Sequence, residues 1–130
     1  MKLNVMFTIA AIFLILTGIV SILGSVVAPA ALGLGALDDT AAFNAMLAGV
    51  GRLSLGVIAW LVRNAEASKT RDSVVLGYTF LFALWAVVSA YGSFLDMPAA
   101  NISWVPALIQ ALIAVGFFMA GKASISKGAS

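Results

Sequence analysis

Hydrophobic residues along the chain fall into four long runs that are separated by short polar segments. The runs cover about residues 4–27, 41–62, 74–95 and 102–121. An α-helix needs roughly 20 apolar residues to cross the hydrocarbon core of a bilayer, and each run meets that length. The pattern predicts an all-α chain, a bundle of four transmembrane helices that forms a single domain over residues 1–130.

The composition supports a location in a membrane. Of the 130 residues, 63% are hydrophobic and 9% are charged, and the mean hydropathy is +1.14. A soluble domain carries about 25% charged residues. The first run follows a lysine, as in a secretion signal, but it exceeds the roughly 7–15 apolar residues of such a signal. We therefore expect it to be retained as a helix.

The charged residues lie mostly between the runs, and their distribution predicts the orientation of the chain. Six of the seven basic residues belong to one side of the membrane: Lys2, Arg63, Lys69, Arg71, Lys122 and Lys127. The connections on the other side hold Asp38, Asp39 and Asp96 and no Lys or Arg. Because cytoplasmic connections are enriched in Lys and Arg, we predict that both termini are cytoplasmic. The charged segment 63–73 is expected to be a solvated turn that meets anionic head groups.

Polar and aromatic residues near the ends of the runs predict how the helices begin and where they meet the interface. Thr40, Ser73 and Ser103 are expected to be N-caps of the second, third and fourth helices. Pro106 is expected in the first turn of the last helix, where its missing N–H costs little. Trp104 and Trp60 are expected at the outer and inner interfaces.

Arg52 lies in the middle of the second run, about ten residues, or roughly 15 Å, from either end. The helical face centred on it carries small residues: Ala45, Ala48, Gly49, Gly56 and Ala59. Small residues allow neighbouring helices to approach closely. We therefore expect Arg52 to point toward other helices and not toward lipid, although burial at this depth costs roughly 2.5–3.5 kcal/mol.

Polar groups must offset this cost, and all five carboxylates of the chain lie in the connections. At a similar depth are Thr17 and Gln110, with Ser21 and Ser89 nearer the outer side. We predict a cluster of Arg52, Gln110, Thr17 and main-chain carbonyls. It either locks helix packing or leaves the cation for an anionic or carbonyl-bearing ligand or a partner's carboxylate, and both interpretations are open.

Two further stripes of residues carry candidate functions. Tyr78, Phe82, Trp85 and Ser89 share one face of the third run. The rings form a wall for a lipid or for a flat apolar ligand such as a quinone, pigment or sterol-like molecule, act as a cation–π partner for Arg52, or fill the gaps opposite the small residues of the second run. Thr17, Ser21 and Ser25 recur every fourth residue of the first run. This stripe is typical of a helix-packing edge, and the alternative is that it lines a narrow polar path.

Catalytic and metal-binding groups are missing from the sequence. The chain has no cysteine and no histidine, which excludes disulfides and the usual ligands of zinc and haem iron. No triad, phosphate-binding glycine loop or pair of carboxylates within the runs can be assembled. Seven scattered basic residues also do not make a nucleic-acid surface. We expect neither an enzyme nor a metal protein.

From residue 45 to residue 122 the order of features resembles small bacterial four-helix membrane proteins that are loosely similar to the DoxX-like families. The resemblance rests on RLSLGVIAWLVRNAEASKTRDSVVLG, then ALWAVVSAYGSF, then ISWVPALIQALIAVGFFMAGK. It implies a four-helix bundle in a bacterial cytoplasmic membrane, with Arg52 and Arg63 at matching positions. It also implies association with respiratory or redox complexes.

These observations leave two classes of function. The first is an accessory or scaffold subunit of a larger membrane complex, with membrane lipids and other subunits or further copies of the chain as partners. The alternative is an oligomeric transporter or channel for anions or small solutes, with Arg52 in the pathway. A ligand site formed by Arg52, Gln110 and Trp85 is compatible with the first class.

Overall fold

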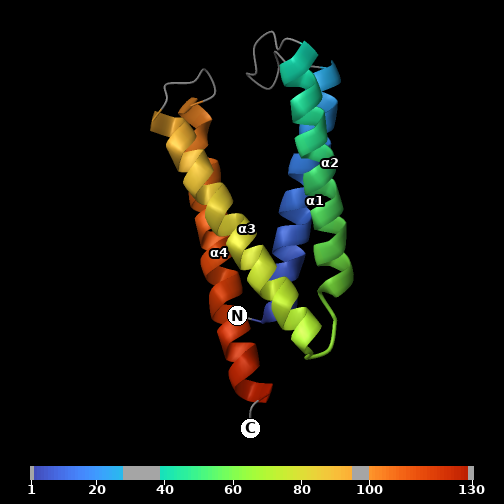
Figure 1. Cartoon of the computed structure of the whole chain (residues 1–130), viewed down its shortest axis with the longest axis vertical. Helices are drawn as coiled ribbons and strands as arrows, with labels where there is room; N and C mark the ends of the chain where they lie inside the picture. The colour runs from blue at the N-terminus through green and yellow to red at the C-terminus, as the bar shows by residue number, and fades with distance from the viewer. Residues whose placement is uncertain (1, 28–38, 95–99, 129–130) are drawn as a thin grey trace. The chain divides into compact units, whose positions relative to one another are not determined.

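The computed structural model describes residues 2–27, 39–94 and 100–128 (Figure 1). Within this part of the chain there are four helices and no strand: α1 Leu3–Val27, α2 Asp39–Val62, α3 Lys69–Phe94 and α4 Ala100–Gly128. Each helix contains a segment that is long and apolar enough to cross a membrane. The predictions of an all-α chain and of four span-length helices are confirmed.

The start of α3 differs from the prediction because a cap, and not hydropathy, determines where a helix begins. The backbone N–H of Arg71 donates to Oγ of Ser68 at 3.1 Å, so Ser68 is the N-cap and α3 begins at Lys69. The hydroxyl of Ser73 donates to the carbonyl of Lys69 at 2.9 Å, within the helix. The prediction that Ser73 is the cap was therefore wrong.

The other predicted caps also lie inside their helices. Because α2 begins at Asp39, Thr40 is in its first turn, and residue 38 lies outside the described residues. The helix α4 begins at Ala100, so Ser103 lies beyond the cap position and Pro106 is inside the helix, past its first turn. Pro106 has no N–H to donate to the carbonyl four residues earlier, and α4 continues through it. The acidic residues Asp38 and Asp96 fall outside the described part of the chain.

Contacts divide the chain into two compact units. One consists of Met1–Ile9 and Leu61–Ser130, and the other consists of Ala10–Trp60. The first unit holds the α3–α4 hairpin with the start of α1, and the second holds most of α1 and α2. Each unit is described by itself below, and the single-domain organisation stays a prediction.

In the Ala10–Trp60 unit, three glycines bring the backbones of α1 and α2 into contact. A Cβ built at Gly18 of α1 would lie 2.8 Å from the backbone nitrogen of Leu53 and 2.9 Å from the carbonyl oxygen of Gly49. A Cβ at Gly56 would lie 2.9 Å from the backbone nitrogen of Ile15. Any side chain at these positions would push the helices apart, so the small-residue face predicted for α2 is the face that packs on α1.

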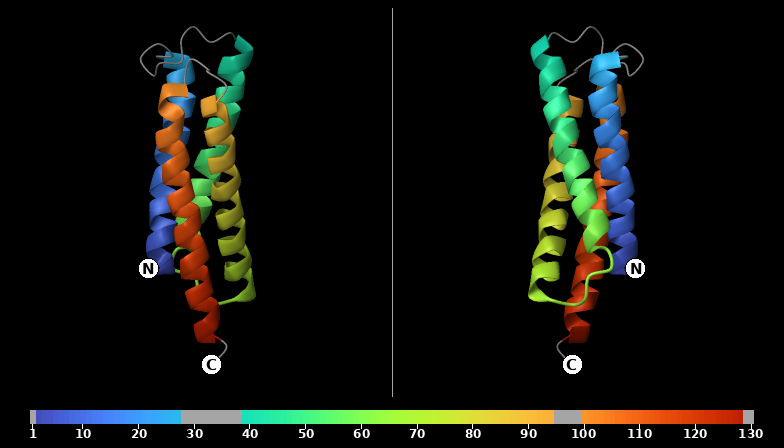
Figure 2. Two further views of the ribbon diagram at one scale, coloured as in Figure 1. Left: turned by 90° about the vertical axis from the view of Figure 1, so that its left-hand side faces the viewer. Right: turned by 90° about the vertical axis from the view of Figure 1, so that its right-hand side faces the viewer.

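In the other unit, a cluster of aromatic rings lies at the centre of the core. Phe7 of α1 contacts Tyr78 and Phe117 edge-on, with ring centroids 5.7 and 5.1 Å apart. Tyr78 and Phe117 stack at 5.6 Å, and Phe82 stacks on Phe117 at 6.3 Å. We call these four residues the aromatic core. Figure 2 shows that α3 and α4 run antiparallel, and the two helices are in contact.

A second aromatic contact joins α3 and α4 at the other end of the hairpin. The ring of Trp104, near the start of α4, meets that of Phe94 at the end of α3, with centroids 5.3 Å apart and an interplanar angle of 80°. Trp104 remains 49% exposed. This partly exposed ring next to an apolar span is the arrangement that a tryptophan adopts at a membrane interface.

Candidate functional site

Arg52 hydrogen-bonds across the α1–α2 contact. Its Nη1 donates to Oγ of Ser21 in α1, and its side chain is half-buried. The face of α2 away from Arg52 is exposed and includes Leu47, Val50 and Leu61 at 55%, 53% and 73%. The arginine therefore points toward α1 within its unit.

The direction of helical side chains explains why Ser21 is the acceptor. Gly18 lies opposite Gly49 and Leu53, so α1 and α2 are antiparallel and position 18 is at the level of position 52. A helical side chain leans toward the N-terminus of its own helix, which carries the guanidinium of Arg52 about one turn back along α2. That level on α1 is one turn beyond Gly18, where Ser21 lies.

Two other hydroxyls of the polar stripe on α1 are bonded within that helix. Thr17 donates to the carbonyl of Phe13 at 2.7 Å, and Ser25 donates to the carbonyls of Ser21 and Ile22 at 2.9 Å each. Such bonds keep a hydroxyl satisfied in an apolar environment. They support the interpretation of the stripe as a packing edge.

Gln110 and Ser89, both predicted site residues, meet in the α3–α4 hairpin. The hydroxyl of Ser89 in α3 donates to Oε1 of Gln110 in α4 at 2.9 Å, and Gln110 is only 3% exposed. A hydrogen bond between transmembrane helices contributes about 0.6 kcal/mol on average, so this bond helps to fix the hairpin. The predicted cluster of Arg52, Gln110 and Thr17 stays a prediction, because Gln110 belongs to the other compact unit.

The aromatic stripe of α3 is buried at Tyr78 and Phe82 and half-buried at Trp85. Tyr78 is 4% exposed and lies in the aromatic core, while Trp85 stacks on Phe82 with centroids 6.3 Å apart. These contacts support the interpretation in which the rings fill space between helices. A bound quinone or pigment against this stripe stays a prediction.

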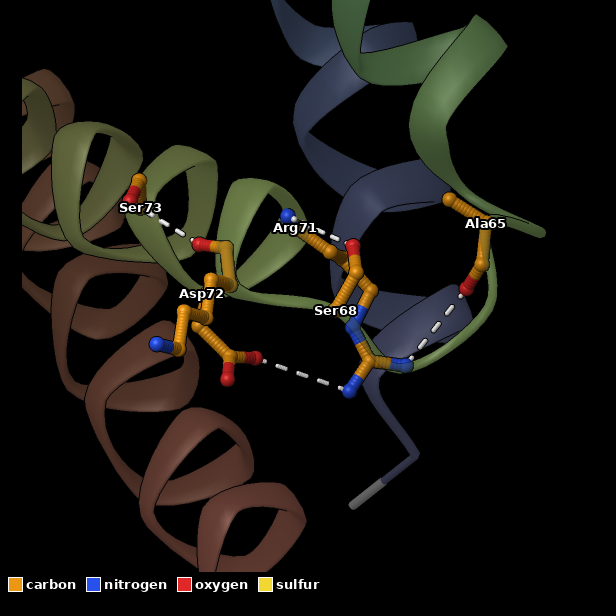
Figure 3. A network of polar contacts seen from close by, with 6 residues as sticks. Ala65, Ser68, Arg71, Asp72 and Ser73 are labelled. Carbon is orange, nitrogen blue, oxygen red and sulfur yellow. Dashed lines mark hydrogen bonds and ion pairs between the residues drawn. The ribbon is translucent and has the colours of Figure 1, made fainter. Parts of the chain in front are cut away.

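The turn between α2 and α3 is held by a small polar network at the start of α3 (Figure 3). Arg71 donates through Nη1 to the carbonyl of Ala65 at 3.4 Å, and its Nη2 lies 3.6 Å from Oδ1 of Asp72. The side chain of Arg71 is only 13% exposed and that of Asp72 is 35% exposed. The turn was predicted to be solvated. Glu66 and Lys69 are exposed and agree with this prediction, whereas the side chain of Arg71 is mostly covered.

A cavity of about 390 Å³ opens on the α3–α4 hairpin next to this network, and the sequence did not predict it. Its lining contains one acid, one base and Thr79 among apolar groups: Asp72, Val75, Leu76 and Thr79 of α3, and Phe117, Phe118, Gly121 and Lys122 of α4. We call these residues the α3–α4 groove. The signal in the sequence was faint: a glycine beside a lysine at the end of the last run, and an aspartate at the start of the third.

A smaller apolar hollow lies on the α1–α2 pair. It has a volume of about 290 Å³ and is lined by Ile12, Ile15, Leu16, Val57 and Trp60. Ile15 is also the residue that a side chain at Gly56 would meet. The hollow therefore lies next to the backbone contact at Gly56, and its lining is entirely hydrophobic.

The fold is that of a multi-span helical membrane protein. Among the described residues, no group of three or more acidic side chains could hold a metal ion. No family model, curated protein or solved structure matches the chain. The resemblance to the DoxX-like families therefore stays a prediction.

Proposed function

We propose that the chain is a non-enzymatic integral membrane protein that serves as an accessory or scaffold subunit of a larger complex in a bacterial cytoplasmic membrane. One observation carries the proposal. Nearly all the described residues belong to four span-length helices, and large apolar side chains are exposed on every one of them.

The exposed surface is suited to contacts within the bilayer plane. Only residues 63–68 connect α2 to α3, so this connection has no room for a folded domain outside the membrane. The strongly exposed side chains include Leu61 of α2, Leu76 of α3 and Leu112 of α4, at 73%, 69% and 72%. Lipid tails and the helices of a partner are the groups that such a surface can contact.

The interior of each unit is suited to holding a shape. Backbone contact at Gly18 and Gly56 fixes α1 against α2, and the aromatic core fixes α3 against α4. Closely packed helix pairs present fixed outer faces to a partner at little cost in conformational entropy. A scaffold subunit requires that property.

Tryptophan scanning of the exposed positions, combined with isolation in native lipids, tests the proposal. A tryptophan on a face that meets only lipid is accommodated, whereas one on a face that meets a partner helix disrupts the fit. We expect a contiguous set of positions on one or two helices at which Trp abolishes co-isolation of the partner. Exposed positions on the remaining helices are the matched controls. The proposal is wrong if the chain is isolated alone from native membranes and no position affects its associations.

A further inference from the structure

We propose that the α3–α4 groove binds a phospholipid whose headgroup ends in a primary ammonium, as in phosphatidylethanolamine. An acyl chain lies on the apolar floor, the phosphate meets Lys122, and the ammonium meets Asp72. The inference rests on the membrane location in the proposed function and does not depend on a partner subunit.

The floor of the groove is suited to a hydrocarbon chain. The floor consists of Val75, Leu76, Phe117 and Phe118. The whole groove has a volume of about 390 Å³, which lies within the usual range of ligand sites, roughly 300–1,000 Å³. Gly121 contributes no side chain, and a Cβ there would lie 2.7 Å from Cγ1 of Val75. The glycine therefore keeps α3 and α4 close together at the floor.

The two charged residues of the lining lie at one end of the groove. Asp72 is in the first turn of α3, and Lys122 is next to the end of the Trp104–Ala123 span of α4. Because the helices are antiparallel (Figure 2), the start of α3 and the end of this span reach the same membrane surface. The charges are therefore at the depth of lipid headgroups, and the apolar floor extends from them toward the hydrocarbon core.

The rim carries charges of both signs, as the headgroup does. Lys122 is exposed, and a lysine ammonium binds phosphate as a compact point charge. Asp72 lies 3.6 Å from Arg71 through Oδ1, and a carboxylate has about four lone-pair sites. The pairing with Arg71 thus leaves acceptor capacity for the N–H groups of a lipid ammonium.

This arrangement favours an ammonium lipid over the two common alternatives. The quaternary ammonium of a choline headgroup has no N–H to donate to Asp72. A glycerol headgroup adds no positive charge, so its phosphate would face the carboxylate of Asp72 with no ammonium between them. A headgroup with both a phosphate and a primary ammonium satisfies Lys122 and Asp72 together.

Native mass spectrometry of the purified full-length chain tests the assignment. The chain in detergent is titrated with phosphatidylethanolamine, phosphatidylcholine and phosphatidylglycerol that carry the same acyl chains. A charge-assisted hydrogen bond corresponds to about a tenfold difference in affinity, so we expect the ethanolamine lipid to be retained about tenfold more tightly than either alternative.

Three variants and one control locate the binding. Asp72→Asn should lower affinity for the ethanolamine lipid to the level of the choline lipid, and Lys122→Met should weaken all three. Leu76→Trp should block the groove, and its side chain is 69% exposed, so the ring does not enter the core. Lys69→Met is the matched control, because Lys69 is an exposed base near the groove but not in its lining; it should change nothing.

Equal retention of the three lipids by the unaltered chain would overturn the assignment. Preferential binding of the glycerol lipid, or a preference for ethanolamine that survives in both Asp72→Asn and Leu76→Trp, would also overturn it. Circular dichroism shows which variants retain their helices. The measurement uses the isolated chain. A negative result would therefore not affect the proposed association with partner subunits, and a failure to find a partner would not affect the lipid assignment.

Discussion

A guanidinium in the middle of a transmembrane helix needs hydrogen-bond acceptors, and Ser21 of α1 provides one for Arg52. A hydrogen bond to a charged group contributes about 1.5–3 kcal/mol in soluble proteins, whereas interhelical hydrogen bonds in membranes reach at most about 1.7 kcal/mol. The bond between Arg52 and Ser21 should therefore contribute more than the average interhelical hydrogen bond in a membrane, which is about 0.6 kcal/mol.

A double-mutant cycle of Arg52→Met and Ser21→Ala should show a coupling energy of about 1 kcal/mol. The free energy of unfolding is measured by denaturation of the four proteins in mixed micelles. Thr17→Ala replaces Ser21→Ala in the control cycle, because Thr17 already donates to its own helix; that cycle should be additive. Coupling of Arg52 to Thr17 and not to Ser21 would contradict the hydrogen bond to Ser21 and would favour Thr17, the partner predicted from the depth of the residues in the membrane.

The sequence predicted the direction in which Arg52 points, but not which hydroxyl it meets. Counting residues along the spans places Thr17 level with the Cα of Arg52, and the guanidinium lies about a turn away from that Cα. The sequence identified Ser89 and Gln110, two polar residues of the α3–α4 hairpin, without predicting that they bond to each other. The depth of a residue is readable from the sequence, whereas the reach of a long side chain is not.

At the scale of the helix, the contact between α1 and α2 depends on the absence of side chains at a few positions. Gly18 and Gly49 are in mutual backbone contact, and Gly56 contacts α1 about two turns further along. Gly51 is on the same helix as Gly49 and Gly56, but a Cβ built there would meet nothing within 4 Å. The chain thus contains glycines of two kinds that composition does not distinguish.

Gly18→Ala should destabilise the α1–α2 pair by about 1–3 kcal/mol, because the new Cβ meets backbone atoms and only a shift of a whole helix can relieve the overlap. Gly51→Ala is the matched control and should be neutral or stabilising by up to about 1 kcal/mol, since alanine favours the helix. Denaturation in mixed micelles measures both. Equal effects of the two substitutions would contradict the backbone contact.

Helix ends show where hydropathy and local chemistry diverge. The apolar run predicted a third helix from about residue 74, but α3 begins at Lys69 because Ser68 caps it. The last helix also begins earlier than its apolar run, at Ala100. Hydropathy reports which residues the lipid core accepts, while a helix extends into the polar interface as far as its capping residues allow.

At the scale of the whole molecule, the number and type of the helices followed from the sequence because twenty-residue apolar runs have few alternatives in a bilayer. The α3–α4 groove did not follow. Its lining comes from residues about 40–50 positions apart, such as Asp72 and Lys122, and only the register of two helices brings them to one place. The pattern of residues within one helix does not reveal how that helix is aligned against its neighbour.

The charges predict the orientation of the chain in the membrane, and this prediction can be tested by cysteine labelling because the sequence has no cysteine. We expect Thr40→Cys, at the start of α2, to react with a membrane-impermeant maleimide on intact cells. Ala67→Cys, in the basic turn, should react only after the membrane is opened. Both positions are exposed, so each serves as the control for the other. The reverse pattern would place the termini outside the cell.

The backbone contact at Gly18 also limits how this sequence can change over evolutionary time. Every substitution there adds at least a Cβ, and the atoms it would meet belong to the main chain and cannot rotate away. Neighbouring residues such as Ile19 and Val20 are 40% and 49% exposed, and lipid accepts many apolar replacements of them. Over evolutionary time, substitutions should therefore change most residues of the first two helices but retain the glycines at positions 18, 49 and 56. A relative too diverged to be matched by overall similarity would still carry these three glycines at the same spacing.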